Sequence, residues 1–410
     1  MIYGVGTHIV ASNLERGRSA LKDLGAQSIR EDILWDASEL TLGVFALNAS
    51  HLAKLAAMES AGVENVLILA YGNNAHGIGQ PYTSAERAKF LDYVRWVVPL
   101  TRHCVKYYEI WNEWNHGAGA SAAQVTSGLH GGTQQYADLC RDAYPIIKSL
   151  APNSIVLTGS TSKVWSGHWY PALCDAGILP FTDGFSVHAY THSEATPNHL
   201  PPRAITYLND IDTLVKAKNG GVSVPQYITE MGWPTHTTGH AASAVGHYLS
   251  WFYRLADQLP FVRGVWWYDL WDDGSVATDR EHRFGLMAND AITPKPAYHA
   301  FKGLTNRTRI DQYGWCRVAV TAAVQTQING GTLPDRVKRG LKDLRSANAT
   351  VAVGARTLNV MSGPVDLAAL DAIGERLGDD LVIIEGPVVR GQVPAQTTAT
   401  RTNTWPNGWS

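Results

Sequence analysis

The sequence has few cysteines, little net charge and no long apolar run. The four cysteines are scattered through 410 residues without a Cys-x-x-Cys spacing, at Cys104, Cys140, Cys174 and Cys316. This pattern indicates neither a zinc site nor a disulfide framework, and we expect no metal and no cofactor. No stretch approaches the roughly 18 consecutive apolar residues of a membrane-spanning helix. The formal net charge of −2 gives no electrostatic reason to expect nucleic acid or an anionic membrane as partner.

The N-terminus, Met1-Ile2-Tyr3-Gly4-Val5-Gly6, lacks a basic segment followed by an apolar core, so no signal peptide is recognisable. Either the protein needs no secretory signal or one has been removed. An extracellular or virion-associated setting fits both of these cases, and a cytoplasmic setting is the alternative.

Aromatic residues, in contrast, are abundant and of an unusual mixture. Tyr (17) and Trp (14) both outnumber Phe (8). Rings with a polar tip suit surfaces that contact sugars or other flat ligands, although many of them will belong to the core.

The first 300 residues alternate between strand and helix patterns. The alternation predicts a parallel sheet, and eight such units over more than about 250 residues favour a closed (β/α)8 TIM barrel. An open doubly wound sheet is the alternative, weakened because no Gly-x-Gly-x-x-Gly turn follows the first strand. The predicted strands cover 2–7, 27–34, 63–71, 105–111, 154–159, 183–190, 225–231 and 262–270. The predicted helices lie near 14–24, 50–61, 84–101, 134–150, 167–176, 203–218, 241–258 and 296–304.

The composition and the pattern of the sequence change after Leu304. We predict a catalytic barrel over 1–304 and a small C-terminal α/β domain of unknown role over 305–410. Within the second domain, helices are expected at 334–347 and 364–377, strands at 351–353, 358–360 and 381–384, and a loop-like tail from 391. The apolar faces of these helices need a partner, so 305–410 is expected to pack on the side of the barrel or to form a homo-oligomer contact.

Two predicted strands far apart in the chain end with a glutamate. Glu113 closes Tyr108-Glu109-Ile110-Trp111-Asn112-Glu113, and Glu230 closes Gln226-Tyr227-Ile228-Thr229-Glu230. A glutamate in a lone strand is usually a solvated edge residue, but a charge at the end of a buried strand is costly. Parallel α/β folds expose their catalytic groups at the C-terminal ends of strands. Two carboxylates from separate strand ends are what glycosidic bond cleavage requires.

Several polar residues near the other strand ends are candidates for supporting roles. Arg30 could keep a carboxylate nucleophile ionised, and its apolar neighbours favour this role over that of a surface arginine at a strand end. Asn112 could bind a sugar hydroxyl. His188 and Tyr190 lie two apart on a strand and share a face, where a core histidine is the competing interpretation.

Tryptophans gather near the seventh and eighth strands. Strand alternation points one of Trp266 and Trp267 inward, and we selected Trp267 as the ring that stacks on a sugar. Trp233, three residues after Glu230, and His8, at the end of the first strand, are further candidates for substrate contact.

These motifs together resemble clan A glycoside hydrolases. The resemblance rests on Trp111-Asn112-Glu113, on His188-x-Tyr190 and on Thr229-Glu230-Met231-Gly232-Trp233. Within the clan, glycoside hydrolase family 39 and its relatives look most similar, from Gly4-Val5-Gly6-Thr7-His8, Trp267-Tyr268-Asp269-Leu270, Phe284-Gly285-Leu286 and Lys295-Pro296-Ala297-Tyr298. The resemblance covers residues 2–304 and implies a (β/α)8 barrel that cleaves glycosides with retention of configuration. It implies Glu113 as acid/base and Glu230 as nucleophile, supported by Arg30, Asn112, His188, Tyr190 and Trp267.

The expected function is therefore that of a retaining glycoside hydrolase acting on a polysaccharide or oligosaccharide, a bacterial exopolysaccharide being one candidate. Two alternatives remain. One is a phage or cell-surface structural component that carries a polysaccharide-degrading barrel, and the other is a sugar-binding barrel without activity. The presence of both acids favours an enzyme over the last of these. Members of family 39 often carry a β-sandwich beside the barrel, and 305–410 does not match that pattern.

Overall fold

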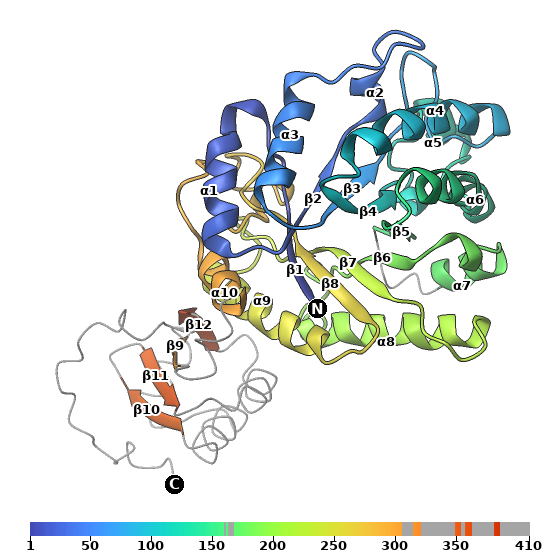
Figure 1. Cartoon of the computed structure of the whole chain (residues 1–410). Coiled ribbons are helices and arrows are strands. Elements are labelled where there is room, and N and C mark those ends of the chain that lie inside the picture. The colour runs from blue at the N-terminus through green and yellow to red at the C-terminus, as the bar shows by residue number, and fades with distance from the viewer. Residues whose placement is uncertain are drawn as a thin grey trace. The chain divides into compact units, whose positions relative to one another are not determined.

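Eight parallel strands follow one another around a closed barrel, as the sequence predicted (Figure 1). The computed structural model describes residues 1–159, 161–162, 168–305, 315–320, 349–353, 357–362 and 381–385. The strands are β1 Ile2–Gly6, β2 Ser28–Asp32, β3 Asn65–Leu69, β4 Val105–Ile110, β5 Ile155–Thr158, β6 Gly184–His188, β7 Gln226–Met231 and β8 Val262–Trp267. The barrel closes where β1 pairs with both β2 and β8, with Gly6 opposite Arg30 and Val5 opposite Trp267.

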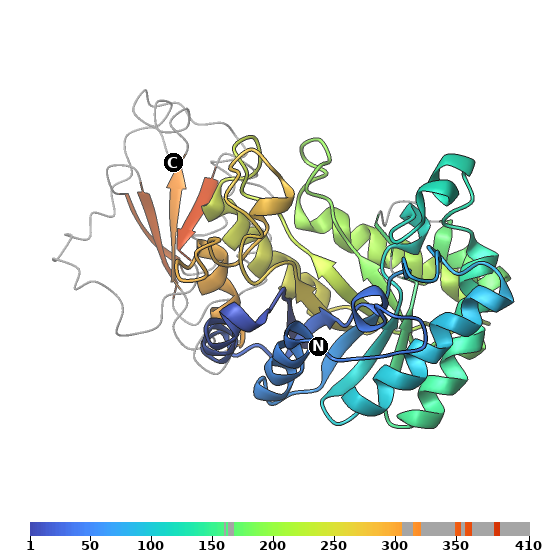
Figure 2. The same ribbon diagram turned by 90° about the horizontal axis from the view of Figure 1, so that it is seen from above.

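Helices α1 to α8 connect the strands from β1 to β7 and lie outside the ring that the strands form, α9 connects β7 to β8, and α10 follows β8 (Figures 1 and 2). They are α1 Leu14–Leu24, α2 Trp35–Ser38, α3 Ala49–Ser60, α4 Ser84–Thr101, α5 Ala122–Ser127, α6 Thr133–Leu150, α7 Trp169–Asp175, α8 Pro201–Lys218, α9 Ala242–Asp257 and α10 Pro296–Thr305. The short helices α2 and α5 lie in loops where no helix was predicted. No helix in the described part of the chain combines the length and the apolarity needed to cross a membrane.

The sequence signals at the helix ends explain where the helices begin and stop. Asn48 accepts a hydrogen bond from the backbone of His51 at the start of α3. Thr83 and Glu86 form a reciprocal capping box at the start of α4. Helix α1 ends at Gly25, whose φ of 63° is one that glycine adopts without a steric penalty.

The interior of the barrel is filled by side chains from opposite strands. Val66, Tyr107, Leu157, Tyr227 and Trp266 form one buried cluster. The ring of Tyr107 on β4 lies 5.5 Å from that of Tyr227 on β7 and 6.0 Å from that of Trp266 on β8. Only a side chain that points inward can reach so far around the barrel, so these positions fix which residues of each strand face the interior.

The contacts within the chain divide it into two units. The first comprises Met1–Gly232 and Tyr253–Asp273 and contains the whole barrel sheet, and the second comprises Trp233–Phe252 and Gly274–Ser410. The predicted boundary at Leu304 remains a prediction.

The second unit contains a four-stranded antiparallel sheet of order β10-β11-β9-β12 (Figure 2). Its strands are β9 Trp315–Val320, β10 Ala349–Val353, β11 Thr357–Ser362 and β12 Leu381–Glu385. The three strands predicted for this region are confirmed, and β9 was not predicted. The helices expected at 334–347 and 364–377 and the tail from 391 lie outside the described residues.

Candidate active site

Polar side chains converge where β2, β4, β6 and β7 end. Arg30 lies in β2, Glu230 is the fifth residue of β7, and His188 is the last residue of β6. Glu113 follows β4 by three residues and Tyr190 follows β6 by two. Strands that run in parallel around a barrel bring these ends to the same rim, which is where barrel enzymes carry their active sites.

Arg30 is the centre of this group, and its three guanidinium nitrogens each donate to a different residue. Nε donates to Glu109 over 2.6 Å, Nη1 to Glu230 over 2.7 Å and Nη2 to Asn112 over 2.7 Å. Burial would lower the pKa of Arg30, but the charges of Glu109 and Glu230 outweigh it and raise the pKa above its ordinary value. The planar, permanently charged guanidinium of Arg30 is therefore fixed between the carboxylates of Glu109 and Glu230.

Glu230 is held at both carboxylate oxygens. Arg30 donates to Oε1, and the hydroxyl of Tyr190 donates to Oε2 over 2.9 Å. The side chain is 12% exposed, so a substrate can still reach it. Burial, together with the charge of Glu230, raises the pKa of Tyr190 well above its ordinary value, so the phenol remains a proton donor.

Glu113 has a different partner. Nδ1 of His188 lies 2.9 Å from Oε1 of Glu113 and 3.4 Å from Oε2 of Glu230. Burial raises the pKa of Glu113, but the hydrogen bond and charge of His188 outweigh burial and lower it below 4.5. His188 is fully buried, whereas Glu113 is 23% exposed.

The backbone around Glu113 is strained, which the sequence did not reveal. Trp111 and Glu113 have φ values of 66° and 48°, in the left-handed region that residues other than glycine rarely adopt. The buried ring of Trp111 holds this turn, because its Nε1 donates to the carbonyl of Ala118 over 2.8 Å and its centroid lies 5.2 Å from that of Trp114 in a T-shaped contact. The chain thus leaves β4 at Ile110 and turns Glu113 toward His188.

Glu109 is a site residue that the sequence analysis did not select. It is fully buried beneath Arg30 and also accepts hydrogen bonds from the hydroxyls of Ser186 and Thr229. Tyr71 was missed as well, and its hydroxyl accepts a hydrogen bond from Asn112 over 2.7 Å. Glu109 lies two residues from Tyr107 and shares the inward face of β4, but burial of both faces of this strand hides that face in the sequence.

His8, predicted as a sugar contact, belongs to a second polar cluster on neighbouring strands. Its Nδ1 lies 2.7 Å from Oδ1 of Asp273 and 3.0 Å from Oδ2 of Asp269, which both follow β8. The charge of Asp269 raises the pKa of His8, and burial raises the pKa of Asp269 to about 6. Neither aspartate was selected from the sequence.

The tryptophans near the seventh and eighth strands are buried, and the substrate contacts predicted for Trp233 and Trp267 remain predictions. Trp266 is the ring that points inward, and it fills the core cluster rather than the rim. A Cβ on Gly4 would lie 2.3 Å from that ring, which explains a glycine at this position. Trp267 has no exposed surface. Trp233 is equally buried and belongs to the second unit, where it packs against Tyr248 and Phe252.

Two groups of described residues have the side chains and the spacing to hold a metal ion. One is Glu113, His188 and Glu230, and the other is His8, Asp269 and Asp273, with the ligand atoms of each group within 4.8 Å of one another. In the first group the guanidinium of Arg30, 2.7 Å from Glu230, already supplies positive charge and would repel a cation.

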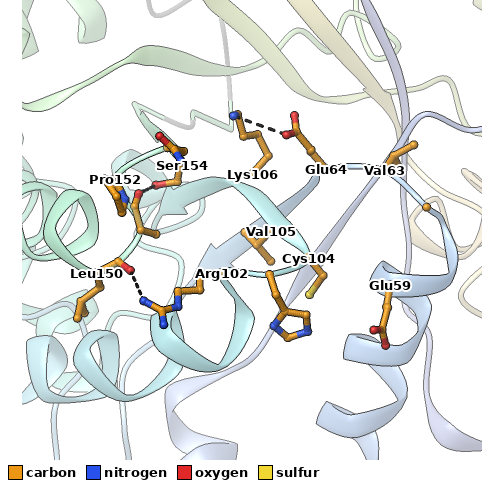
Figure 3. A pocket seen from close by; sticks show the side chains of 14 residues that line it. Glu59, Val63, Glu64, Arg102, Cys104, Val105, Lys106, Leu150, Pro152 and Ser154 are labelled. Carbon is orange, nitrogen blue, oxygen red and sulfur yellow. Dashed lines mark hydrogen bonds and ion pairs between the residues drawn. The ribbon is translucent and has the colours of Figure 1, made fainter.

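A pocket of about 630 Å³ lies at the other end of the barrel, among the loops that precede β3, β4 and β5 (Figure 3). Three of its charged groups are engaged: Lys106 pairs with Glu64, and Arg102 donates to the carbonyl of Leu150. Burial raises the pKa of the Cys104 thiol to about 11, so it is no nucleophile. The pocket therefore lacks the reactive groups that converge at the opposite rim.

Comparison with known proteins connects the fold to solved structures. No model of a protein family and no curated protein matches the chain. A family 39 glycoside hydrolase from the gut symbiont Bacteroides cellulosilyticus WH2 is 22% identical, with a TM-score of 0.62, and the match covers 78% of this chain and 66% of that one. GH5_18 from Streptomyces cattleya, solved with GlcNAc, is 17% identical, with a TM-score of 0.59 and coverage of 76% and 81%.

A GH5_18 from Bifidobacterium longum subsp. infantis is 16% identical, with a TM-score of 0.55, and the match covers 75% of this chain and 79% of that one. At identities this low, these matches establish that the fold is shared and nothing more. The predicted resemblance to clan A glycoside hydrolases, family 39 in particular, is confirmed at that level.

Proposed function

We propose that this protein is a glycoside hydrolase that cleaves an oligosaccharide or polysaccharide with retention of anomeric configuration. The observation that carries the proposal is the spacing of the two acids: a carboxylate oxygen of Glu113 and one of Glu230 lie within 4.8 Å of each other. Retaining enzymes hold their carboxyl groups about 5–5.5 Å apart, whereas inverting enzymes leave about 6.5–9.5 Å for a water molecule. The short spacing supports direct attack by one carboxylate.

Glu230 is the nucleophile in this proposal. A nucleophilic carboxylate must be ionised and aimed at the anomeric carbon. Arg30 and Tyr190 each donate a hydrogen bond to one oxygen of Glu230, which restricts rotation of the carboxylate. Glu109 supports this arrangement from below by fixing Nε of Arg30.

Glu113 is the general acid and base. It is more exposed than Glu230, and it accepts a hydrogen bond from His188, whose ring can also change its protonation. The general acid must carry a proton when the substrate binds. Because His188 lowers the pKa of Glu113, we expect an acidic pH optimum.

The reaction has two displacements. In the first, Glu230 attacks the anomeric carbon, the glycosidic bond breaks, and Glu113 gives its proton to the departing oxygen. In the second, Glu113 takes a proton from water, the water oxygen attacks the anomeric carbon, and the ester bond to Glu230 breaks. Each carboxylate ends in its starting state. Asn112, fixed by Arg30 and Tyr71, is positioned to bind a hydroxyl of the sugar.

The substrate class is a carbohydrate, and a bacterial exopolysaccharide is one candidate. The test is incubation with panels of aryl glycosides and of bacterial and plant polysaccharides, followed by proton NMR of the first product formed. We expect the anomer of the product to match that of the substrate. An inverted first product would contradict retention and leave glycosidase activity standing.

Two other functions are separated by the same assay. A sugar-binding barrel would bind members of the panel without releasing product. A virion or cell-surface component with a depolymerising barrel would release product and also co-purify with particles or envelopes.

For residues 305–410 we propose a subunit contact, tested by comparing the mass in solution of the full chain with that of a chain ending at Leu304. The same number of subunits in both chains, calculated from these masses, would contradict it.

A further inference from the structure

His8 and the two aspartates after β8 form a cluster that the proposed glycosidase chemistry does not use. Strands β1 and β8 are hydrogen-bonded neighbours, so the segments that follow them lie side by side. His8 follows the end of β1, and Asp269 and Asp273 follow the end of β8. Both carboxylates approach the same ring nitrogen, Nδ1 of His8, at 2.7 Å and 3.0 Å.

One nitrogen cannot satisfy two carboxylates. Nδ1 carries at most one hydrogen, and Oδ1 of Asp273 lies at hydrogen-bond distance from it. Oδ2 of Asp269 is left buried without a hydrogen-bond partner, on a side chain that is 1% exposed. A buried carboxylate oxygen without a hydrogen bond is costly, and a bound cation in contact with it would offset that cost.

We propose that His8, Asp269 and Asp273 bind a divalent transition-metal ion. The three ligand atoms lie within 4.8 Å of one another. Ligand atoms that share a metal at 2.0–2.2 Å lie about 3 Å from each other, so the present separations of 2.7 Å and 3.0 Å need only small adjustments. A cation contacts all three atoms at once, which a single proton cannot do.

The chemistry of the ligands narrows the kind of ion. One imidazole nitrogen and two carboxylate oxygens suit Mn²⁺ or Zn²⁺ better than Ca²⁺ or Mg²⁺, which prefer oxygen ligands alone. Cysteine thiolates are not involved, so the scattered cysteines do not bear on this site.

The surroundings of the cluster fix its geometry and leave a route for the ion. The backbone N–H of Leu270 donates to the other oxygen of Asp269, and the hydroxyl of Tyr268 donates to Oδ2 of Asp273 over 3.2 Å. Such outer hydrogen bonds orient metal ligands. The His8 side chain is 45% exposed, so the ion can enter and keep water in its remaining positions.

The test is direct binding to the full chain after treatment with EDTA and dialysis. Free Mn²⁺ is followed by electron paramagnetic resonance and Zn²⁺ by calorimetry, at pH 7.5, where ligand atoms compete less with protons. We expect saturable binding of one ion per chain. Asp273→Asn, at a partly exposed position that tolerates an isosteric change, should weaken binding by more than about tenfold.

Two further variants make the result decisive. Glu15→Gln alters an 83% exposed carboxylate in the same unit and should leave the affinity unchanged. Glu230→Gln reports on the other group of three residues. Absence of saturable binding overturns the proposal, and so does binding that survives Asp273→Asn or is lost only in Glu230→Gln.

Discussion

The fully buried carboxylate of Glu109 accepts the Nε–H of Arg30 over 2.6 Å, and this pair supports the whole rim. The two other guanidinium nitrogens of Arg30 each donate to a further residue of this rim, Asn112 and Glu230. If Arg30 had only one carboxylate partner, its guanidinium could adopt several orientations. Glu109 selects one of these orientations and so determines the position of Glu230, the proposed nucleophile.

Glu109→Gln should destabilise the protein strongly. Removing the charge leaves a buried guanidinium with one carboxylate in place of two, and breaking a buried ion pair costs about 3–5 kcal/mol. Urea denaturation measures the free energy of unfolding. Glu15→Gln, on the surface, serves as control and should change it by no more than about 0.5 kcal/mol. Equal stability of Glu109→Gln and the wild type would contradict the role given to this pair.

Tyr190→Phe should lower kcat by about tenfold to a hundredfold, because Glu230 loses one of the two groups that orient it. The measurement is steady-state kinetics on an activated aryl glycoside. Tyr144→Phe is the matched control, since it removes a hydroxyl that also donates to a carboxylate, that of Asp183, away from the rim. A loss of the same size in both variants would mean that the effect is structural.

His188→Asn should move the basic limb of the pH profile of kcat/KM to higher pH. His188 is the main cause that lowers the pKa of Glu113 against the effect of burial. Without it the pKa of Glu113 rises, and the general acid keeps its proton to a higher pH. His103→Asn, in the pocket at the other end of the barrel, should leave the profile unchanged. A shift toward acid pH in His188→Asn would contradict the account.

Glu31 should make the protein less stable as the pH rises. Burial raises the pKa of this carboxyl from 4.5 to about 7. The folded state therefore favours the protonated form, and the stability that it provides is complete below about pH 4.5 and lost as the pH rises through 7. At roughly 1.4 kcal/mol per pH unit the loss is about 3 kcal/mol. Urea denaturation at pH 5 and pH 8 should show this dependence in the wild type and a much weaker one in Glu31→Gln.

The alternation of patterns in the sequence predicted the eight strands and the barrel well, because buried strands and amphipathic helices follow from local periodicity. The strand ends were less accurate. The predicted strands ran to 190 and 270, whereas β6 and β8 end at His188 and Trp267. The chain turns there to present Tyr190 and Asp269, and such turns depend on contacts with neighbouring strands that one segment does not record.

The same limit explains the residues that were missed or left unplaced. Strand β4 is buried on both faces, so the pattern around Glu109 does not show which face meets Arg30. Alternation correctly required one of Trp266 and Trp267 to point inward but could not say which. Gly4 and Gly264, whose missing side chains leave room for the ring of Trp266, were the available signal.

The central claim is that Glu230 attacks the sugar and Glu113 supplies the proton. The most direct test compares Glu230→Gln and Glu113→Gln on a natural glycoside and on the corresponding 2,4-dinitrophenyl glycoside, whose leaving group needs little protonation. We predict that Glu230→Gln is inactive on both, because an amide cannot form the glycosyl ester, and that Glu113→Gln retains cleavage of the dinitrophenyl substrate only. Equal losses on both substrates in both variants would contradict these roles.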